Sequence, residues 1–362
     1  MKKLIIISLS AIFVGYLLFW PVEIEPVSWD APKNEGYVDR FSQNQQLSQI
    51  QRIDLSGKVG PEDYALNQNG TIYFGLLGGE IGFLDQAGKL YSWVNTKGRP
   101  LGLEFDKKGN LIVADAFEGL LEISPEGIIN TLVTEVDGIP LNYADDVDVA
   151  DNGKIYFTDA STKFHAKQYG TFAASMLDIM EHGGHGRVLE YDPATKQATT
   201  VVSGLDFANG ITISHDQSWV LVNETGTYRV LRVGITNSNK GQVETVIENL
   251  PGFPDNISRG SNNVYWVGLV SPRSAALDAL SGSGFLRKVV QRLPTFLQPK
   301  AKHFGHIIAI NDQGEVVHNL QDPLGMYGHT TGAIEVGADL YVSSLLDTAL
   351  GKTANINIVI EK

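Results

Sequence analysis

A short pattern that recurs six times constrains the fold of this chain more than any other feature. Ten residues after the middle position of each copy, an apolar run typical of a β-strand begins, and a turn with Gly, Asn or Asp lies between the two. A strand, a tight turn and a second strand therefore recur as a hairpin in every copy. The six middle positions are Glu62, Leu101, Asp145, Asn209, Asp255 and Thr331.

Further strand-like runs follow in most copies, and repeated four-stranded units of this size predict an all-β, six-bladed β-propeller. A solenoid is the alternative, but it needs capping repeats at its ends, and none is present in the sequence. A ring has no ends, and segments 50–55 and 356–360 could share one blade and close it. Extra residues at 162–186 lengthen blade three, and those at 271–304 lengthen blade five.

The N-terminus differs from the rest of the chain. A short basic flank, Met1-Lys2-Lys3, precedes an uncharged and mostly apolar run at residues 4–20. At ~1.5 Å per residue, a helix of this length just spans the hydrocarbon core of a membrane. The alternative is a cleaved signal peptide, but no A-x-A-like site follows. We therefore predict a single-pass anchor, with the propeller on the non-cytoplasmic (periplasmic or extracytoplasmic) side because the lysines stay in the cytoplasm.

These patterns divide the chain into an anchor at 1–20, a linker at 21–47 and a propeller at 48–362. The linker prediction rests on Pro, Asn, Gln and Ser without an apolar period. The net charge of −13 argues against nucleic acid as a partner, because phosphate contacts need clustered Lys and Arg. The chain has no cysteine, which excludes thiolate nucleophiles and cysteine-ligated metals.

The ring gives the repeat positions a chemical meaning. The innermost strand of each blade lines the axis, so all six middle positions are expected to converge at the tunnel mouth. Four of them carry oxygen donors suited to a cation: Glu62, Asp145, Asn209 and Asp255. Two carboxylates ~4 Å apart repel by about 4 kcal/mol at an effective dielectric of ~20, so three together raise their pKa values or recruit a cation. Hard oxygen ligands in an irregular geometry favour Ca²⁺ over Mg²⁺. Alternatively, the acids only cap turns.

The residues that follow three of these positions are also polar. Asp63, Asp146 and Asn256 alternate to the other side of the strand. They are expected either to support the first ligands by hydrogen bonds or to hold a second, deeper ion.

Several of these segments resemble a known superfamily. Pro61-Glu62-Asp63, Ala144-Asp145-Asp146, Phe207-Ala208-Asn209-Gly210 and Pro254-Asp255-Asn256 are similar to the calcium motifs of the gluconolactonase, paraoxonase and strictosidine synthase propellers. KIYFTDAS at 154–161 and GRVLEYDP at 186–193 resemble the strictosidine synthase-like branch. The N-terminal anchor and the insertion at 271–304 are similar to the adipocyte plasma-membrane-associated protein branch.

The resemblance implies a calcium-dependent hydrolase of lactones or esters, with Ca²⁺ held by Glu62, Asp145, Asn209 and Asp255. It also implies that a second ion would use the positions of Asp63 and Asp146. Leu101 stands where paraoxonases carry a catalytic His, and Thr331 falls near the catalytic Glu of strictosidine synthase. These departures support an alternative, a membrane-tethered, calcium-stabilised binding propeller without the condensing activity.

Asp255 is the expected base or nucleophile, because it is both a predicted ligand and a carboxylate. His329 is the best placed histidine, since the repeat register puts it at the mouth. His165, His182 and His185 in the blade-three insertion are weaker candidates, expected to be exposed or to serve in packing.

The insertion at 271–304 predicts two short helices, at 275–280 and 285–293. From residue 279 to residue 310 there is no acid, while the segment carries five basic residues. We expect it either to rest on anionic headgroups beside the anchor or to form a lid over the tunnel mouth. The basic residues are Arg287, Lys288, Arg292, Lys300 and Lys302.

Overall fold

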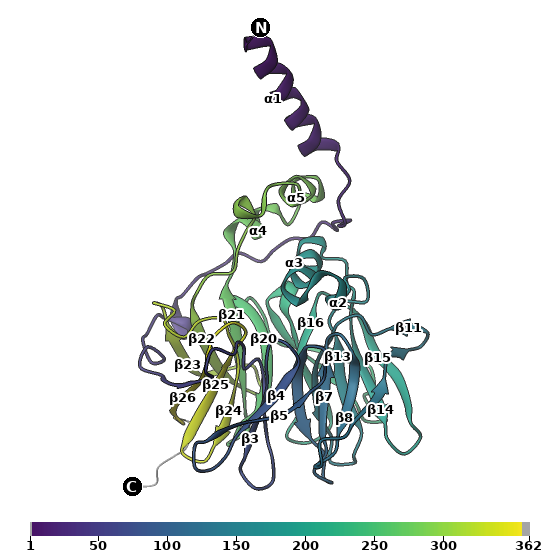
Figure 1. Ribbon diagram of the computed structural model, residues 1–362, viewed down its shortest axis with the longest axis vertical. Helices are drawn as coiled ribbons and strands as arrows, with labels where there is room; N and C mark the ends of the chain where they lie inside the picture. Colours follow the sequence, from purple (N-terminus) through teal and green to yellow (C-terminus); the bar gives the residue numbers. More distant parts are fainter. Residues whose placement is uncertain (1, 357–362) are drawn as a thin grey trace.

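Six four-stranded antiparallel sheets form a closed ring in the computed structural model, which describes residues 2–356 (Figure 1). The first strand of each blade contacts the first strand of the next, from β2 through β6, β12, β16, β20 and β24 back to β2. These six strands therefore surround the axis, and the chain is a six-bladed β-propeller, as the repeat predicts.

The strands of the first three blades follow one another along the chain. Blade one has β2 (Tyr64–Leu66), β3 (Ile72–Gly75), β4 (Glu80–Leu84) and β5 (Leu90–Asn95). Blade two has β6 (Pro100–Phe105), β7 (Leu111–Asp115), β8 (Gly119–Ile123) and β9 (Ile129–Val133). Blade three has β12 (Ala144–Val149), β13 (Ile155–Asp159), β14 (Gly186–Asp192) and β15 (Gln197–Leu205). A small hairpin, β10 (Glu135–Val136) and β11 (Ile139–Pro140), connects blades two and three.

Blades four and five repeat the arrangement. Blade four has β16 (Ala208–Ile213), β17 (Trp219–Glu224), β18 (Arg229–Gly234) and β19 (Val243–Ile247). Blade five has β20 (Gly252–Arg259), β21 (Val264–Pro272), β22 (Gly305–Asn311) and β23 (Val316–Asp322).

Blade six joins the two ends of the ring. β24 (Thr330–Val336), β25 (Asp339–Ser344) and β26 (Ala349–Ala354) are completed by β1 (Gln51–Asp54) from the start of the propeller. β1 pairs antiparallel with β26, from Gln51 opposite Lys352 to Asp54 opposite Ala349. The predicted clasp therefore forms, but with 349–354 as the C-terminal partner. The strand predicted at 356–360 lies, from residue 357 on, outside the described residues.

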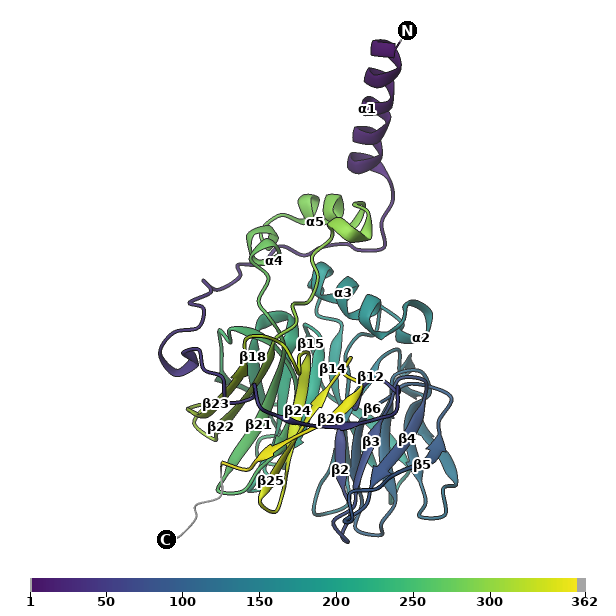
Figure 2. The ribbon, with the colours of Figure 1, turned by 60° about the vertical axis from the view of Figure 1, so that its left-hand side comes forward.

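The helices lie over one face of the ring, the face from which α1 (Lys2–Phe19) extends (Figures 1 and 2). The blade-five insertion contains α4 (Ala275–Leu280), α5 (Gly284–Gln291) and the short 3-10 helix η3 (Thr295–Leu297), which confirms the two predicted helices. The blade-three insertion contains α2 (Ala166–Tyr169) and α3 (Thr171–Glu181), which the sequence analysis did not predict. A 3-10 turn, η2 (Thr225–Thr227), follows β17.

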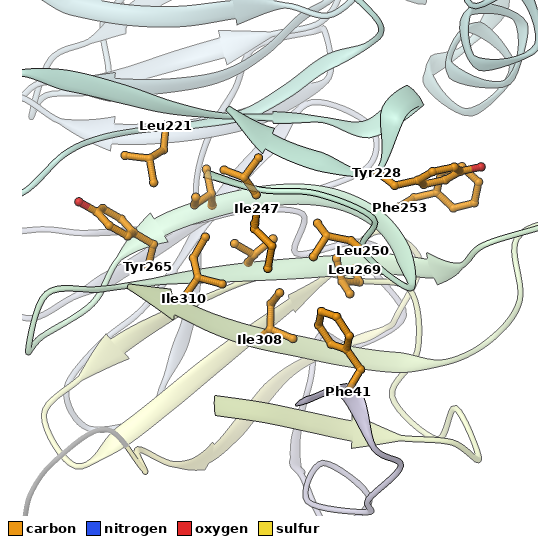
Figure 3. Close-up of a cluster of buried hydrophobic side chains, with 13 residues drawn as sticks. Phe41, Leu221, Tyr228, Ile247, Leu250, Phe253, Tyr265, Leu269, Ile308 and Ile310 are labelled. Carbon is orange, nitrogen blue, oxygen red and sulfur yellow. The ribbon is translucent and has the colours of Figure 1, made fainter. Parts of the chain in front are cut away.

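The segment predicted as a linker, 21–47, packs against the propeller at several points. Ile24 is fully buried, and the Trp29 ring stacks on His182 with centroids 4.0 Å apart. Phe41, at the end of the 3-10 turn η1 (Asp39–Phe41), joins the hydrophobic cluster between blades four and five (Figure 3). Leu47 is buried in the cluster between blades five and six. The segment therefore connects the C-terminal end of α1 to the side of the propeller through buried contacts.

Candidate metal centre

One pocket at the helix-bearing end of the tunnel collects the residues of the repeat positions. Its polar lining includes Glu62, Asp145, Asn209 and Asp255, as the ring geometry predicts. Leu101 lines the same pocket. The other apolar walls come from the blade tops, from α3 and from the insertion that carries α4, and they include Tyr143, Phe207, Phe253, Phe172, Met176, Ile179 and Leu277.

A backbone irregularity recurs at these positions. The pairing of the first and second strands shifts register between Ala144 and Val147, and between Ala208 and Ile211. The same shift occurs in blades two, five and six. A bulge changes the direction of a side chain and ends the regular ladder. The bulges therefore explain how residues on a strand can present oxygens to the axis.

Glycine allows the inner strands to come close together there. A Cβ on Gly210, directly after Asn209, would lie 2.4 Å from the carbonyl oxygen of Asp255. A Cβ on Gly102 would lie 2.4 Å from Oδ1 of Asp146. Larger residues at these two positions would push neighbouring blades apart, so the glycines help to set the distance between ligand-bearing strands.

Three buried side-chain oxygens in this pocket lack a hydrogen-bond partner within residues 2–356: Oε2 of Glu62, Oδ2 of Asp145 and Oδ1 of Asn209. All three residues are at least 95% buried. An unpaired buried oxygen is costly unless a cation or a proton satisfies it. Carboxylate and amide oxygens are the donors that Ca²⁺ prefers, so these residues fit that ion.

The electrostatics of the pocket point the same way. Burial, and then the neighbouring Asp255 and Asp145, hold the pKa of Glu62 well above its usual value. Burial raises the pKa of Asp255 to about 7. Burial also raises the pKa of Asp145, and the nearby carboxylate of Asp255 raises it further. Without a cation, the carboxyl groups of this pocket therefore hold protons to unusually high pH.

The arrangement is open rather than preassembled. Within the described residues, no three His, Cys, Asp or Glu side chains form a compact metal-binding group. A cation would have to draw the three carboxyl groups together, with the amide of Asn209 as a fourth donor.

Asp63 and Asp146 lie deeper, in a second pocket farther along the inner strands. Oδ2 of Asp63 accepts from the backbone N–H of Leu103 at 2.9 Å. Asp146 accepts from the N–H groups of Val147 and Ile211, at 2.8 and 2.7 Å. Each carboxyl group thus accepts a hydrogen bond from the innermost strand of the next blade. A second ion at Asp63 and Asp146 stays a prediction.

Asn256 and Thr331 support Glu62. Asn256 donates to the carbonyl oxygen and to Oε1 of Glu62, at 3.1 and 3.2 Å. The Thr331 hydroxyl donates to the same carbonyl oxygen at 2.6 Å and is fully buried. Thr331 is therefore held behind the pocket and does not share in lining it, which departs from the expectation that all six repeat positions would converge at the mouth.

His329 lines the pocket, as the register predicts. Its Nδ1 lies 3.3 Å from the carbonyl oxygen of Val270, and its ring meets His303 edge-on with centroids 4.4 Å apart. A hydrogen bond from Nδ1–H to that carbonyl leaves Nε2 as the acceptor. Burial and then His303 lower the pKa of His329, so the neutral ring is favoured.

The three other candidate histidines, those of the blade-three insertion, lie outside this pocket. His185 bonds to Glu181 at 2.6 Å, His182 pairs with Asp206 at 3.2 Å beneath Trp29, and His165 precedes α2.

Arg99 belongs to this site but was not predicted from the sequence. Its side chain is 2% exposed, and Nε and Nη1 have no partner in the part of the chain that the structure describes. Burial dominates and raises the pKa of both Glu62 and Asp145, and the charge of Arg99 offsets only part of this rise. Its place two residues before Leu101 in the repeat was the only available signal.

Comparisons with known proteins agree with this architecture. A family model for strictosidine synthase matches residues 145–238, and one for the N-terminal region of strictosidine synthase-like proteins matches residues 39–84. Adipocyte plasma membrane-associated protein of Salmo salar is 33% identical over 95% of this chain and 86% of its own length. Protein STRICTOSIDINE SYNTHASE-LIKE 10 of Arabidopsis thaliana is 35% identical, over 83% of this chain and 86% of its own.

Solved structures share the fold at low sequence identity. A gluconolactonase from Xanthomonas campestris superimposes with a TM-score of 0.62 and 14% identity, over 85% of this chain and 91% of its own. A regucalcin from Agrobacterium tumefaciens, described as a calcium-binding protein, gives a TM-score of 0.58 and 14% identity, over 84% and 93%.

Proposed function

The chain belongs to the strictosidine synthase-like family of six-bladed propellers, together with the adipocyte plasma membrane-associated proteins, and from this we propose a calcium-dependent hydrolase of lactones or esters. The reaction would take place in the pocket at the helix-bearing end of the tunnel. α1 would anchor the enzyme in a membrane, with the propeller on the non-cytoplasmic side.

The unpaired oxygens of Glu62, Asp145 and Asn209 carry this proposal. With Asp255 they supply three carboxylates and one amide, a hard-oxygen donor set that suits Ca²⁺. A Ca²⁺ ion held by these residues would supply Lewis-acid chemistry, polarising a substrate carbonyl and stabilising negative charge that develops on its oxygen. Gluconolactonase and regucalcin, which share the fold, are consistent with this chemistry.

The residues of this chain would supply the rest. The apolar walls, among them Phe172 and Phe253, bind the hydrocarbon part of the substrate and exclude bulk water. Nε2 of His329 accepts a proton from a water molecule as its oxygen attacks the carbonyl carbon, and the proton then passes to the leaving alkoxide. Asp255 is the alternative base or nucleophile, because it lies in the same pocket.

The test is hydrolysis of a panel of lactones and aryl esters by the full-length protein in detergent. We expect turnover that EDTA abolishes and added Ca²⁺ restores. Turnover that survives complete removal of calcium would reject the proposed mechanism.

The location of the protein can be tested separately. α1 is long and apolar enough to cross a membrane, by length and composition, and the similar relatives include plasma-membrane-associated proteins. In spheroplasts or sealed vesicles of known orientation, protease added on the non-cytoplasmic side should digest the propeller. Full protection there would reverse the proposed orientation.

A binding propeller without catalysis is the second candidate. Leu101 is an apolar pocket wall and Thr331 is a buried support for Glu62, so neither position offers the acid or base found in related enzymes. Tight calcium binding without turnover across the whole panel would favour this candidate.

A further inference from the structure

The basic residues of the blade-five insertion are only partly exposed: Lys300 and Lys302 are exposed and Lys288 is half-buried, whereas both arginines are buried. Arg287 is only 2% exposed, and it donates to the carbonyl oxygens of Met180, Ser281 and Val27. Arg292 is also buried. These two arginines hold α5 against α3 and the N-terminal segment, so neither guanidinium can meet lipid headgroups.

Arg292 joins the insertion directly to the end of α1. Its Nη1 donates to the carbonyl oxygen of Leu17 at 2.9 Å, and its Nε donates to that of Trp20. A cation there also suits the negative end of the helix dipole. α1 ends at Phe19, so these two bonds attach the insertion directly to the last turn of the apolar helix and to the residue that follows it. α5 lies near the C-terminal end of α1 (Figure 2), and η3 follows α5 closely in the chain. If α1 lies in a bilayer, this part of the insertion therefore lies at its surface.

Four apolar side chains of the insertion are exposed. Phe285 and Leu286 of α5 are 55% and 44% exposed, and Phe296 and Leu297 of η3 are 71% and 57% exposed. Removing apolar surface from water is favourable, so four partly exposed apolar side chains on one short insertion make water an unfavourable environment for this surface.

We propose that Phe285, Leu286, Phe296 and Leu297 form a membrane-contacting surface that inserts into the bilayer holding α1. The occupant is the lipid itself, since the surface continues from the end of the apolar helix. The contact is hydrophobic, so it needs no anionic lipid. Ser274, Leu277 and Lys300 of the same insertion line the candidate pocket, whose helix-covered end would therefore face the bilayer. This inference rests on the proposed anchor and not on the proposed chemistry.

The chain has no cysteine, so single cysteines can be placed without removing others. Full-length Phe285→Cys and Phe296→Cys, each carrying an environment-sensitive NBD label, would be reconstituted in phosphatidylcholine vesicles with and without nitroxide-labelled lipid. Ile128→Cys is the matched control: Ile128 is 60% exposed, in the turn between β8 and β9 at the other end of the strands. Ile7→Cys in α1 reports on the anchor itself.

We expect blue-shifted emission and quenching by the nitroxide lipids at positions 285 and 296, unchanged in about 0.5 M salt, and neither effect at 128. Labels at 285 and 296 as exposed to water as the one at 128 would overturn the proposal. A blue shift without lipid quenching would also overturn it, because the surface would then be covered by protein. Insertion that requires anionic lipid would overturn the proposal that the contact with the membrane is hydrophobic. An unquenched label at position 7 would refute the anchor, and with it the premise of this inference, whatever the hydrolase assay shows.

Discussion

Asn256 Nδ2 donates to Oε1 of Glu62 at 3.2 Å, which connects β20 of blade five to a residue two positions before β2 of blade one. It also donates to the Glu62 carbonyl oxygen at 3.1 Å. One oxygen of the carboxyl group is thus fixed, while Oε2 has no partner among residues 2–356. The bond orients Glu62 with its free oxygen available to an ion, which makes Glu62 the most informative position to change.

Glu62→Gln should weaken calcium binding at least tenfold, about 1.4 kcal/mol. The substitution keeps the volume of the side chain but removes one negative charge from the donor set. Isothermal titration calorimetry with Ca²⁺ on the wild-type and variant proteins measures the change. Glu126→Gln, in an exposed turn, is the control for the change in net charge. Equal affinity in all three proteins would remove Glu62 from the ligand set.

Calcium affinity should fall as the pH drops below about 7. Burial raises the pKa of Asp255 from 3.8 to about 7, so protons compete with the ion in this range. Each displaced proton costs up to about tenfold in affinity per pH unit. Calorimetry between pH 5 and pH 8 in two buffers of different ionisation enthalpy would show the proton release. Affinity that stays constant over this range contradicts the assignment.

The same shift predicts how the calcium-free protein responds to pH. The folded state holds the Asp255 proton more tightly than the unfolded chain does. Its contribution to stability is therefore complete below about pH 4 and is lost as the pH rises through about 7. Melting temperatures in EDTA should decrease from pH 5 to pH 8, and added Ca²⁺ should raise them most at the upper end. A stabilisation by Ca²⁺ that is largest at pH 5 would be the opposite result.

His329→Gln should lower kcat by about 10²-fold or more, with a smaller effect on KM, if Nε2 is the base. His303→Gln is the control, because His303 touches the ring of His329 but does not line the pocket. Because the pKa of His329 is lowered, activity at saturating Ca²⁺ should persist below pH 6.5, and the part of the acid limb that comes from His329 should vanish in its variant. Equal losses in both variants would reduce His329 to a packing role.

Much of the ring could be predicted because the repeat fixes which residues face the axis. The register placed Glu62, Asp145, Asn209 and Asp255 in one pocket, and the structure brings them together there. The repeat register does not predict which hydrogen-bond partner each of these side chains has. Thr331 occupies an equivalent position, yet its hydroxyl bonds to the backbone of Glu62 and stays behind the pocket.

The helices that were predicted have clear local signals, and those that were missed do not. The predicted helices α4 and α5 begin after Ser274 and Ser283, whose side chains accept from the backbone N–H groups of Leu277 and Leu286 as N-caps. α3 follows Gly170 without a side-chain cap. Its buried face also includes two acids, which obscures the apolar period: Asp178 and Glu181.

The segment 21–47 has no period because it is extended and contacts a different element at each anchoring point. Phe41→Ala tests whether that packing matters. We expect the free energy of unfolding to fall by about 2–4 kcal/mol, since Phe41 is buried in the cluster between blades four and five. Val38→Ala, at an exposed position nearby, should change it by less than about 0.5 kcal/mol. Chemical denaturation measures both, and similar small losses would show that the segment detaches without cost.

Glu181 connects α3 to the N-terminal segment, and its pH dependence should be opposite to that of Asp255. Burial alone raises its pKa, but bonds from His185, Lys163 and the backbone N–H of Glu25 outweigh burial and lower it from 4.5 to about 2. Its contribution to stability is therefore present above about pH 4.5 and is lost as the pH falls toward 2.

Glu181→Gln should reduce the free energy of unfolding by about 1–3 kcal/mol at pH 7, a range that allows for solvent screening because its partners Lys163 and His185 are partly exposed. The difference from wild type should shrink as the pH falls from 4.5 toward 2, because the wild-type carboxylate then takes up a proton and becomes as neutral as the amide. Glu23→Gln changes an exposed acid of the same segment and should show little effect at any pH. Denaturant unfolding of the three proteins between pH 2.5 and pH 7 provides the comparison. A difference that does not vary with pH would mean that Glu181 acts through its shape and not through its charge.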